Sequence, residues 1–208
     1  MSRWEPDGRG RLEQAALALY TERGFDNTTV AEIAARAGVT ERTFFRHFAD
    51  KREVLFAGGE VLRELLVGAV AGASESVAPI EAVAAALEAA GALLQERREY
   101  ARQRQAVIAA NAGLQERREY SLRRQAVIDA NAALQERELI KLASLASALA
   151  DALRKRGVTD PAAGLTAEAG IAIFKIAFER WVNETGPADL PELIRESLDE
   201  LRAVTAGR

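Results

Sequence analysis

Four basic side chains fall within ten residues of one another in this sequence: Arg42, Arg46, His47 and Lys51. An arginine can pair through two parallel hydrogen bonds with guanine or with a phosphate, and a lysine acts on a phosphate as a point charge. Phosphate contacts supply much of the affinity of proteins for nucleic acids. The cluster therefore predicts binding to a polyanion, provided that the surrounding elements leave these side chains on an exposed face.

Residues 28–55 have the pattern of two short helices separated by a tight turn. Thr29 and Glu32 have the spacing of a capping box that begins the first helix, and Gly38 ends that helix. Thr40 follows at once and can cap the second helix. Two helices joined by so short a turn are typical of a helix-turn-helix, whose second helix enters the major groove of DNA.

The second helix of this motif has one apolar face. Phe44 and Phe48 are four residues apart, so both side chains can pack inward on the rest of the domain. The positions left facing outward include Glu41, Arg42, Thr43, Phe45, Arg46 and His47. We therefore expect the basic cluster to lie on the face that approaches DNA.

Helical periodicity extends along the rest of the chain, and no strand alternation is seen. The first helix has an apolar stripe formed by Leu12, Ala16, Leu19 and Tyr20, and Gly24 ends it. Residues 50–53 form a second capping box, which predicts a fourth helix through Leu55, Leu62, Leu65 and Leu66. Further helices are predicted over residues 79–100 and 134–156, after Pro161, and after a cap at Asp189. The expected fold is all-α.

The N-terminal motif resembles the tetracycline-repressor (TetR) family closely over about the first 57 residues. The family's two threonines, Ile-Ala helix, Gly-Val-Ser/Thr turn, Thr-Leu-Tyr-like triplet, His-Phe pair and following Lys and Leu stand here as Thr28-Thr29-Val30-Ala31-Glu32-Ile33-Ala34, Gly38-Val39-Thr40, Thr43-Phe44-Phe45, His47-Phe48 and Lys51 with Leu55. Beyond this segment the resemblance is one of length and helical layout. It implies a transcriptional regulator, by default a repressor, that binds operator DNA.

The resemblance also implies roles for individual residues. Thr29 and Thr40 would anchor the DNA backbone, which suits hydroxyls at helix N-termini. His47 and Lys51 would contact phosphates, and Thr43 would approach base edges, where its methyl group suits a thymine methyl. The complete predicted DNA-binding set is Thr29, Thr40, Glu41, Arg42, Thr43, Phe45, Arg46, His47 and Lys51.

Three positions depart from the family pattern. Arg42 stands where many members have a small residue, and Phe45 stands where many have a tyrosine. Phe45 lacks a hydroxyl, so it can contact a thymine methyl or a sugar, or simply pack. Arg46 replaces a commonly aromatic or polar residue, and it is either a DNA contact or a solvated side chain. These departures leave the operator sequence unpredicted.

Composition argues against several other classes of protein. The 208 residues include no cysteine and one histidine, so we expect neither a disulfide framework nor a metal site. No phosphate-binding loop or nucleophile–base pair occurs in a recognisable motif, and we expect neither enzymatic activity nor a cofactor. No apolar run approaches the roughly 18 residues of a membrane span, and no secretory signal is present, so we expect a cytoplasmic protein without membrane contact. Residues 1–57 contain nine basic and nine acidic side chains, so the distribution of cations matters more than their sum.

A block of 20 residues is present twice in tandem. Residues 94–113 and 114–133 are identical at 15 of 20 positions, and a third, truncated copy begins at Leu134. A wholly helical insertion of this length would add about 30 Å and rotate the following side chains by roughly 200°. We therefore expect a break in the helix, at residues 111–113 rather than at residues 131–133, because Gly113 disfavours helix.

The resemblance implies two domains, residues 1–57 for DNA binding and residues 58–208 for effector binding and dimerisation. Its last two helices would form a four-helix bundle with a second copy. Independently, residues 165–182 are apolar nearly all round, and the final helix has a matching stripe, so these surfaces must be covered. The predicted homodimer interface comprises Ile173, Phe174, Phe178, Trp181, Leu190, Ile194, Leu198 and Leu201. A two-fold dimer would bind a palindromic operator in double-stranded DNA.

The effector pocket is the least defined feature of the sequence. Apolar candidates for its lining are Leu62, Leu66, Val83, Leu87, Leu93, Val107 and Ile108, which equally suit an ordinary core. They favour an apolar small-molecule effector of unknown identity. By shifting the fourth helix, such an effector would change the spacing of the two recognition helices and release the DNA. The alternative is a helical scaffold, or an engineered variant of this fold, that has lost specific DNA or ligand binding.

Overall fold

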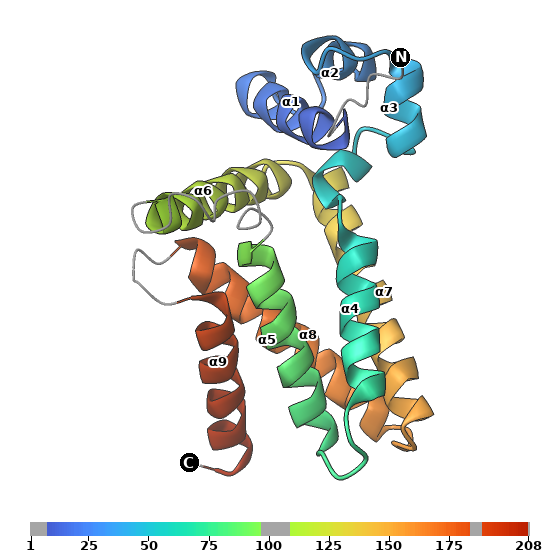
Figure 1. The fold of residues 1–208 in the computed structure, drawn as a ribbon, viewed down its shortest axis with the longest axis vertical. Helices are drawn as coiled ribbons and strands as arrows, with labels where there is room; N and C mark the ends of the chain where they lie inside the picture. The colour runs from blue at the N-terminus through green and yellow to red at the C-terminus, as the bar shows by residue number, and fades with distance from the viewer. Residues whose placement is uncertain (1–7, 97–108, 184–188, 208) are drawn as a thin grey trace. The chain divides into compact units, whose positions relative to one another are not determined.

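The computed structural model describes residues 8–96, 109–183 and 189–207, and all regular elements in these ranges are helical (Figure 1). The expected all-α fold is therefore confirmed. The chain divides into two compact units. Unit 1 comprises Met1–Gly59 together with Arg123–Leu139, and unit 2 comprises Glu60–Leu122 together with Ile140–Arg208. The functional division at residue 57 stays a prediction.

Unit 1 contains the predicted helix-turn-helix. Its N-terminal elements are α1 (Gly8–Arg23), α2 (Val30–Arg36), α3 (Glu41–His47) and the 3-10 turn η1 (Glu53–Phe56). The α1 stripe predicted from the sequence is buried, and it packs with α2, α3 and η1. Gly24 has a φ of +81°, a left-handed conformation that ends α1 as predicted. These contacts give the motif a small core of its own.

The prediction of one continuous fourth helix from residue 50 is wrong. The Asp50 carboxylate does accept a hydrogen bond from the Glu53 backbone N–H, at 3.2 Å. However, the helix that it caps is the single turn Glu53–Phe56, and α4 begins separately at Gly59–Gly72. Gly58 lies between them with a φ of +90°. A residue in this left-handed conformation cannot continue a right-handed helix, so the two elements are separate.

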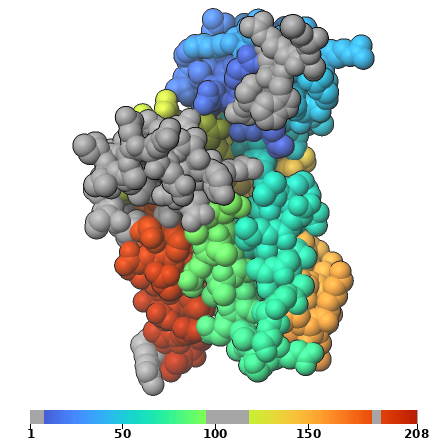
Figure 2. Space-filling model, viewed as in Figure 1, coloured from blue at the N-terminus to red at the C-terminus, as the bar shows by residue number. Residues whose placement is uncertain are grey.

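Unit 2 is built around one apolar core. It contains α4, α5 (Pro79–Glu96), most of α7 (Ala132–Lys155), α8 (Ala162–Asn183) and α9 (Leu190–Thr205). Helix α5 packs against α8 and α9, which also pack against each other. On the face shown in Figure 2, the surface of α5 is flanked by α4 and α9. Gly170 of α8 allows close approach to α5, because an added Cβ would collide with Val83.

The predicted break at residues 111–113 is also wrong. These residues lie inside α6 (Ala109–Asp129), and the interruption occurs between α6 and α7. There the Asn131 side chain accepts a hydrogen bond from the Ala133 backbone N–H, at 3.1 Å, and so caps α7. A single glycine costs a helix only about 1 kcal/mol, whereas an asparagine cap actively begins a new one. Residues 97–108, in the first copy of the duplicated block, lie outside the described residues.

Candidate nucleic-acid interface

The first helix of the motif begins with the predicted capping box. The Thr29 hydroxyl accepts the Glu32 backbone N–H at 3.2 Å, and the Glu32 carboxylate accepts the Thr29 backbone N–H at 2.9 Å. Hydrogen bonds from the backbone and the hydroxyl of Thr29 hold the pKa of Glu32 below its usual value. The reciprocal pair fixes the position at which the chain enters α2.

The turn between α2 and α3 needs a glycine. Gly38 has a φ of +68°, and the next backbone N–H, that of Val39, donates to the Ala34 carbonyl at 2.9 Å. Thr40 then caps α3 by accepting the Thr43 backbone N–H at 3.2 Å. The hydroxyls of Thr40 and Thr43 lie 3.1 Å apart, so Thr43 is half-buried beside the cap. Both helix starts are therefore fixed locally, and the predicted phosphate contacts of Thr29 and Thr40 stay predictions.

Three phenylalanines orient α3. Phe44 is fully buried and Phe48 is nearly so, as the sequence predicted, and their ring centroids lie 5.6 Å apart. Phe45 is 55% exposed, and its ring meets that of Phe44 edge to face with the centroids 5.4 Å apart. The buried pair anchors the helix, and the edge-to-face contact restrains an exposed aromatic ring on its outer side.

The outer side of α3 has three basic side chains that the fold leaves available. Arg42, Arg46 and His47 are exposed, and none of them forms a hydrogen bond or an ion pair within the described part of the chain. Glu41 is exposed on the first turn of the helix. In contrast, Arg36 forms two hydrogen bonds to Glu22, at 2.6 and 2.7 Å. The donors of α3 can therefore meet a ligand, whereas a basic side chain of α2 is used within the fold.

Lys51 is used differently from the role that the resemblance implies. Its ammonium donates to the backbone carbonyls of Phe25 and Thr28, each at 2.9 Å, and at 3.4 Å to that of Asp26. It also lies 4.4 Å from the centroid of the Phe25 ring. An ammonium has three donors, and these carbonyls occupy them. Lys51 thus stabilises the loop between α1 and α2, and its phosphate contact stays a prediction.

The residues predicted to line an effector pocket lie mostly in the core of unit 2. Leu66, Val83 and Leu87 are buried in the main cluster, and Leu62 packs against it. Leu93 is half-buried, while Val107 and Ile108 lie outside the described residues. The described positions thus behave as ordinary core, which was the other interpretation of the sequence.

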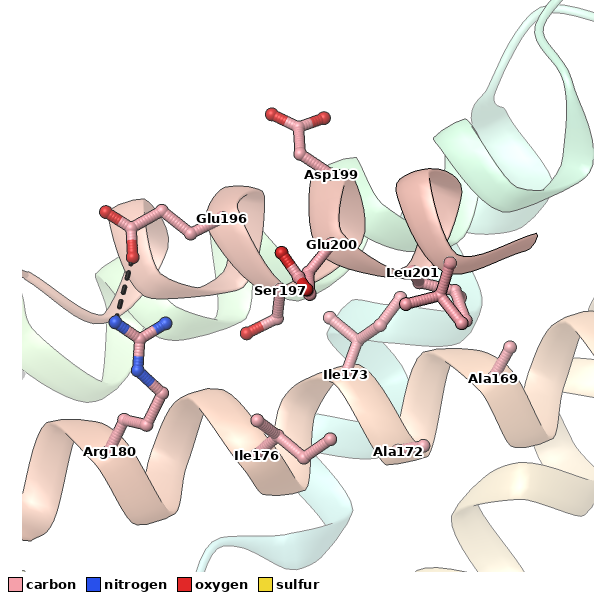
Figure 3. A pocket seen from close by; sticks show the side chains of 11 residues that line it. Ala169, Ala172, Ile173, Ile176, Arg180, Glu196, Ser197, Asp199, Glu200 and Leu201 are labelled. Carbon is pink, nitrogen blue, oxygen red and sulfur yellow. Dashed lines mark hydrogen bonds and ion pairs between the residues drawn. The ribbon is translucent and has the colours of Figure 1, made fainter. Parts of the chain in front are cut away.

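A groove of about 820 Å³ lies instead along α8 and α9 (Figure 3). Two residues of the predicted dimer interface, Ile173 and Leu201, line it. Arg180 and Glu196 form an ion pair at 3.0 Å at one end of the groove. Most of the other predicted interface residues are buried within the chain itself, namely Trp181, Leu190, Ile194 and Leu198, while Phe174 and Phe178 are half-buried. The predicted set therefore largely forms the core of the protomer.

The exposed apolar residues of this face were missing from the prediction. Leu165 and Ile176 of α8 are 69% and 52% exposed, and Val204 of α9 is 65% exposed. Together with Ala169 and Ala172, the α8 residues have spacings of four, three and four residues, which place them on one face of the helix. The sequence contained this spacing, but the all-round apolar character of α8 concealed which face was inward.

Two other kinds of site are missing from the parts of the chain that the structure describes. No group of three histidine, cysteine, aspartate or glutamate side chains is placed to bind a metal ion in residues 8–96, 109–183 and 189–207. Within the same ranges, no helix is both long and apolar enough to cross a bilayer.

Comparison with known families gives matches at both ends of the chain. The family described as "Bacterial regulatory proteins, tetR family" matches residues 13–57. The family described as "MftR C-terminal domain" matches residues 101–206, about half of the chain. The two matches together cover both the helix-turn-helix and the C-terminal helices.

Among curated proteins, the HTH-type transcriptional regulator TcmR of Streptomyces glaucescens is 36% identical over 81 residues, which are 39% of this chain and 36% of TcmR. The HTH-type transcriptional repressor KstR2 of Mycobacterium tuberculosis is 41% identical over 58 residues, 28% of each protein. These matches thus cover far less than two thirds of either relative.

Among solved structures, SmeT, the repressor of the Stenotrophomonas maltophilia multidrug efflux pump SmeDEF, has a TM-score of 0.54 at 21% identity and covers 96% of this chain and 90% of its own. The SmeT–triclosan complex has a TM-score of 0.61 at the same identity of 21%, covering 95% of this chain and 90% of that one. At this identity the similarity establishes the fold.

Proposed function

Because this chain belongs to the tetR family of bacterial regulatory proteins, whose relatives are transcriptional regulators, we propose that it is a repressor that binds a palindromic operator as a homodimer and is released by a small-molecule effector. The observation that most supports DNA binding is the outer face of α3. Arg42, Arg46 and His47 are exposed there, unpaired within the described ranges, beside the exposed ring of Phe45. Free guanidinium groups on a recognition helix suit guanine edges and phosphates.

The fold supports insertion of α3 into a major groove. Thr29 and Thr40 fix the two helix starts, and Phe44 anchors α3 against the rest of unit 1. A recognition helix must be rigid before it binds, because ordering it on DNA would cost affinity. Thr43, at the first turn of α3, lies where helix-turn-helix proteins contact base edges.

The homodimer is supported by the exposed face of α8 and α9. Ile176 and Val204 expose apolar surface beside the groove, and acidic side chains at Asp199 and Glu200 border it. An apolar stripe with a polar rim is typical of a protein–protein interface. Two copies joined by a two-fold axis would place their α3 helices on half-sites about 34 Å apart or a multiple of this distance.

The dimer is tested by Ile176→Glu, which places a charge on the proposed interface without touching the core. Val61→Glu, at a 42% exposed position of α4, is the matched control. Sedimentation velocity should show a dimer for the wild type and the control and a monomer for Ile176→Glu. A dimer that persists in Ile176→Glu would show that this face is not the interface.

DNA binding is tested by incubating the protein with fragments of its source genome at about 150 mM salt, where non-specific binding is weak, and sequencing what is retained. The control is Arg42→Ala with Arg46→Ala, because these side chains pair with no described residue and their removal should not unfold the protein. Enrichment of one palindromic site, absent from the control, is the expected result. Equal retention of all fragments would instead favour the helical scaffold without specific binding.

Release by an effector is tested on the retained DNA complex with a collection of apolar small molecules. The compound that frees the DNA should also raise the melting temperature of the protein without DNA, because a ligand stabilises the state that it binds. The same two assays on a chain lacking residues 94–113 would show whether the duplicated block affects the pocket. The contacts of the helix-turn-helix described above involve no residue of that block.

A further inference from the structure

The corner between α6 and α7 belongs structurally to the helix-turn-helix unit. Residues Arg123–Leu139, the end of α6 and the start of α7, form one compact unit with Met1–Gly59. Ile128 and Leu134, one on each side of the corner, are both fully buried. Neither of them is part of the main apolar cluster of unit 2. The corner is therefore packed as a component of unit 1, although α6 and α7 begin and end in unit 2.

Arg124 fastens the end of α6 to the segment that follows the helix-turn-helix. Its Nε donates to the Leu55 carbonyl at 2.6 Å, and its guanidinium carbon lies 5.0 Å from the centroid of the Phe56 ring. Its side chain is 18% exposed and forms an ion pair at 3.6 Å with Glu138 of α7. One arginine thus contacts η1 through a hydrogen bond and a cation–π contact, and it also contacts α7.

Two further side chains of the corner contact the same unit. Arg137 of α7 forms an ion pair with Glu53, the first residue of η1. Asn131, between the two helices, donates to the Asp26 carboxylate at 3.2 Å. All of these partners lie on η1 or on the loop between α1 and α2. The corner therefore contacts the helix-turn-helix unit at two places.

The connection through α4 is built differently. Phe56 ends η1, Ala57 is extended, and Gly58 has a φ of +90° before α4 begins at Gly59. Nothing lies within 4 Å of a Cβ built on Gly59, so this link is unsupported by packing. In contrast, α6 and α7 each pass from one unit into the other as uninterrupted helices. Rigid helices transmit displacements, whereas a link containing two glycines absorbs them.

We infer that Arg124 and Arg137 are positioning residues, through which α6 and α7, rather than α4, couple the C-terminal helices to the DNA-binding helices. The inference rests on the proposed function, since it names the route by which DNA binding and effector binding influence each other. Coupling between two sites is reciprocal. DNA bound at α3 must therefore change the state of α6 and α7, and this effect can be measured without knowing the effector.

The experiment is hydrogen–deuterium exchange on the full chain, with and without the DNA fragment retained in the genomic selection. Binding should slow exchange in residues 118–122 and 140–150 by roughly fivefold or more, the lower end of ordinary coupling between sites. The double variant Arg124→Ala, Arg137→Ala should still bind the fragment but should not show this slowing. Arg124→Lys with Arg137→Lys should restore it, because lysine keeps a donor for Leu55, a cation for Phe56 and a partner for Glu53. Arg154→Ala, which breaks the ion pairs with Asp151 and Asp160 at the far end of α7, is the control and should behave as the wild type.

Slowing that is confined to residues 59–72 of α4, that persists in the double alanine variant, or that is absent everywhere would overturn the inference. If the wild type binds no fragment at all, the proposed function fails separately. The positioning role is then decided by exchange of residues 53–56 in the protein without DNA. Faster exchange there in the double alanine variant supports it, and unchanged exchange overturns it.

Discussion

The hydroxyl of Tyr20 donates a 2.7 Å hydrogen bond to the backbone carbonyl of Lys51, 31 residues further along the chain. Lys51 in turn donates its ammonium to the carbonyls of Phe25 and Thr28. The two residues thus tie together α1, the loop that follows it and the segment after α3. Burial, with a smaller contribution from the charge of Asp50, raises the pKa of Tyr20, so its hydroxyl remains a donor at neutral pH.

Tyr20→Phe should lower the free energy of unfolding by about 0.5–1.5 kcal/mol, the net value of one hydrogen bond. The ring is retained, and so is its edge-to-face contact with Phe25, whose centroid is 5.2 Å away. Urea denaturation followed by circular dichroism measures the difference. An unchanged midpoint would show that water replaces the hydroxyl as partner of the Lys51 carbonyl.

Lys51→Met should lower the free energy of unfolding by roughly 1.5–3 kcal/mol, because it removes charge-assisted hydrogen bonds to the loop carbonyls. It should leave the salt dependence of operator binding unchanged, since the ammonium is used within the fold. A lysine that contacts a phosphate would instead contribute about one unit to the slope of log K against log salt. Fluorescence anisotropy with labelled operator at several salt concentrations measures this slope.

The comparison for Lys51→Met is Arg42→Ala with Arg46→Ala, which leaves the fold intact and should reduce the slope by about one for each phosphate that the truncated side chains can no longer reach. A slope that falls equally in Lys51→Met would restore the phosphate contact implied by the family resemblance. Both variants are measured at a temperature at which Lys51→Met is fully folded.

Features that depend on neighbours in sequence were predictable. The capping box of Thr29 and Glu32 needs only a spacing of three residues, and the inward pair Phe44 and Phe48 needs only the helical period. The start of α9 at Asp189 was predictable for the same reason, since its carboxylate accepts the Glu192 backbone N–H. In each case both partners are determined within one turn of helix.

Features that depend on distant partners were not predictable. Nothing near Lys51 in the sequence indicates that its ammonium meets carbonyls more than 20 residues earlier. Arg124 and Leu55 are 69 residues apart, so the contact of the α6–α7 corner with unit 1 had no local signature. The break in the fourth helix was missed because the left-handed conformation of Gly58 competes with a capping box that the sequence contains.

Stability should fall in acid as Glu32 is protonated. Hydrogen bonds from Thr29 hold the pKa of Glu32 below the ordinary value of 4.5. A carboxylate whose folded pKa is lowered contributes stability that is present above its unfolded pKa and is lost as the pH falls through the folded pKa. Melting temperatures measured from pH 6 down to about pH 3 should therefore decline more steeply in the wild type than in Glu32→Gln.

Glu32→Gln isolates this residue from the other carboxylates, because glutamine keeps an oxygen that can accept the Thr29 backbone N–H but does not titrate. Its melting temperature at neutral pH should lie below that of the wild type, and the two should converge in acid. Parallel declines at all pH values would show that the capping box does not depend on the charge of Glu32.

Two glycines of α8 should respond oppositely to alanine. A Cβ on Gly170 would collide with Val83 of α5, whereas nothing lies within 4 Å of a Cβ built on Gly164. Gly170→Ala should therefore lower the free energy of unfolding by about 1–3 kcal/mol through overpacking. Gly164→Ala should raise it by about 0.4–1 kcal/mol, because alanine loses less backbone entropy on folding.

The collision itself is tested by adding Val83→Ala to Gly170→Ala. Removing the valine methyl groups leaves room for the new Cβ, so the double variant should be more stable than the sum of the two single effects predicts. Chemical denaturation of the four proteins closes the cycle. Strict additivity would mean that α5 and α8 can move apart freely at this crossing, and that Gly170 is not required for their close approach.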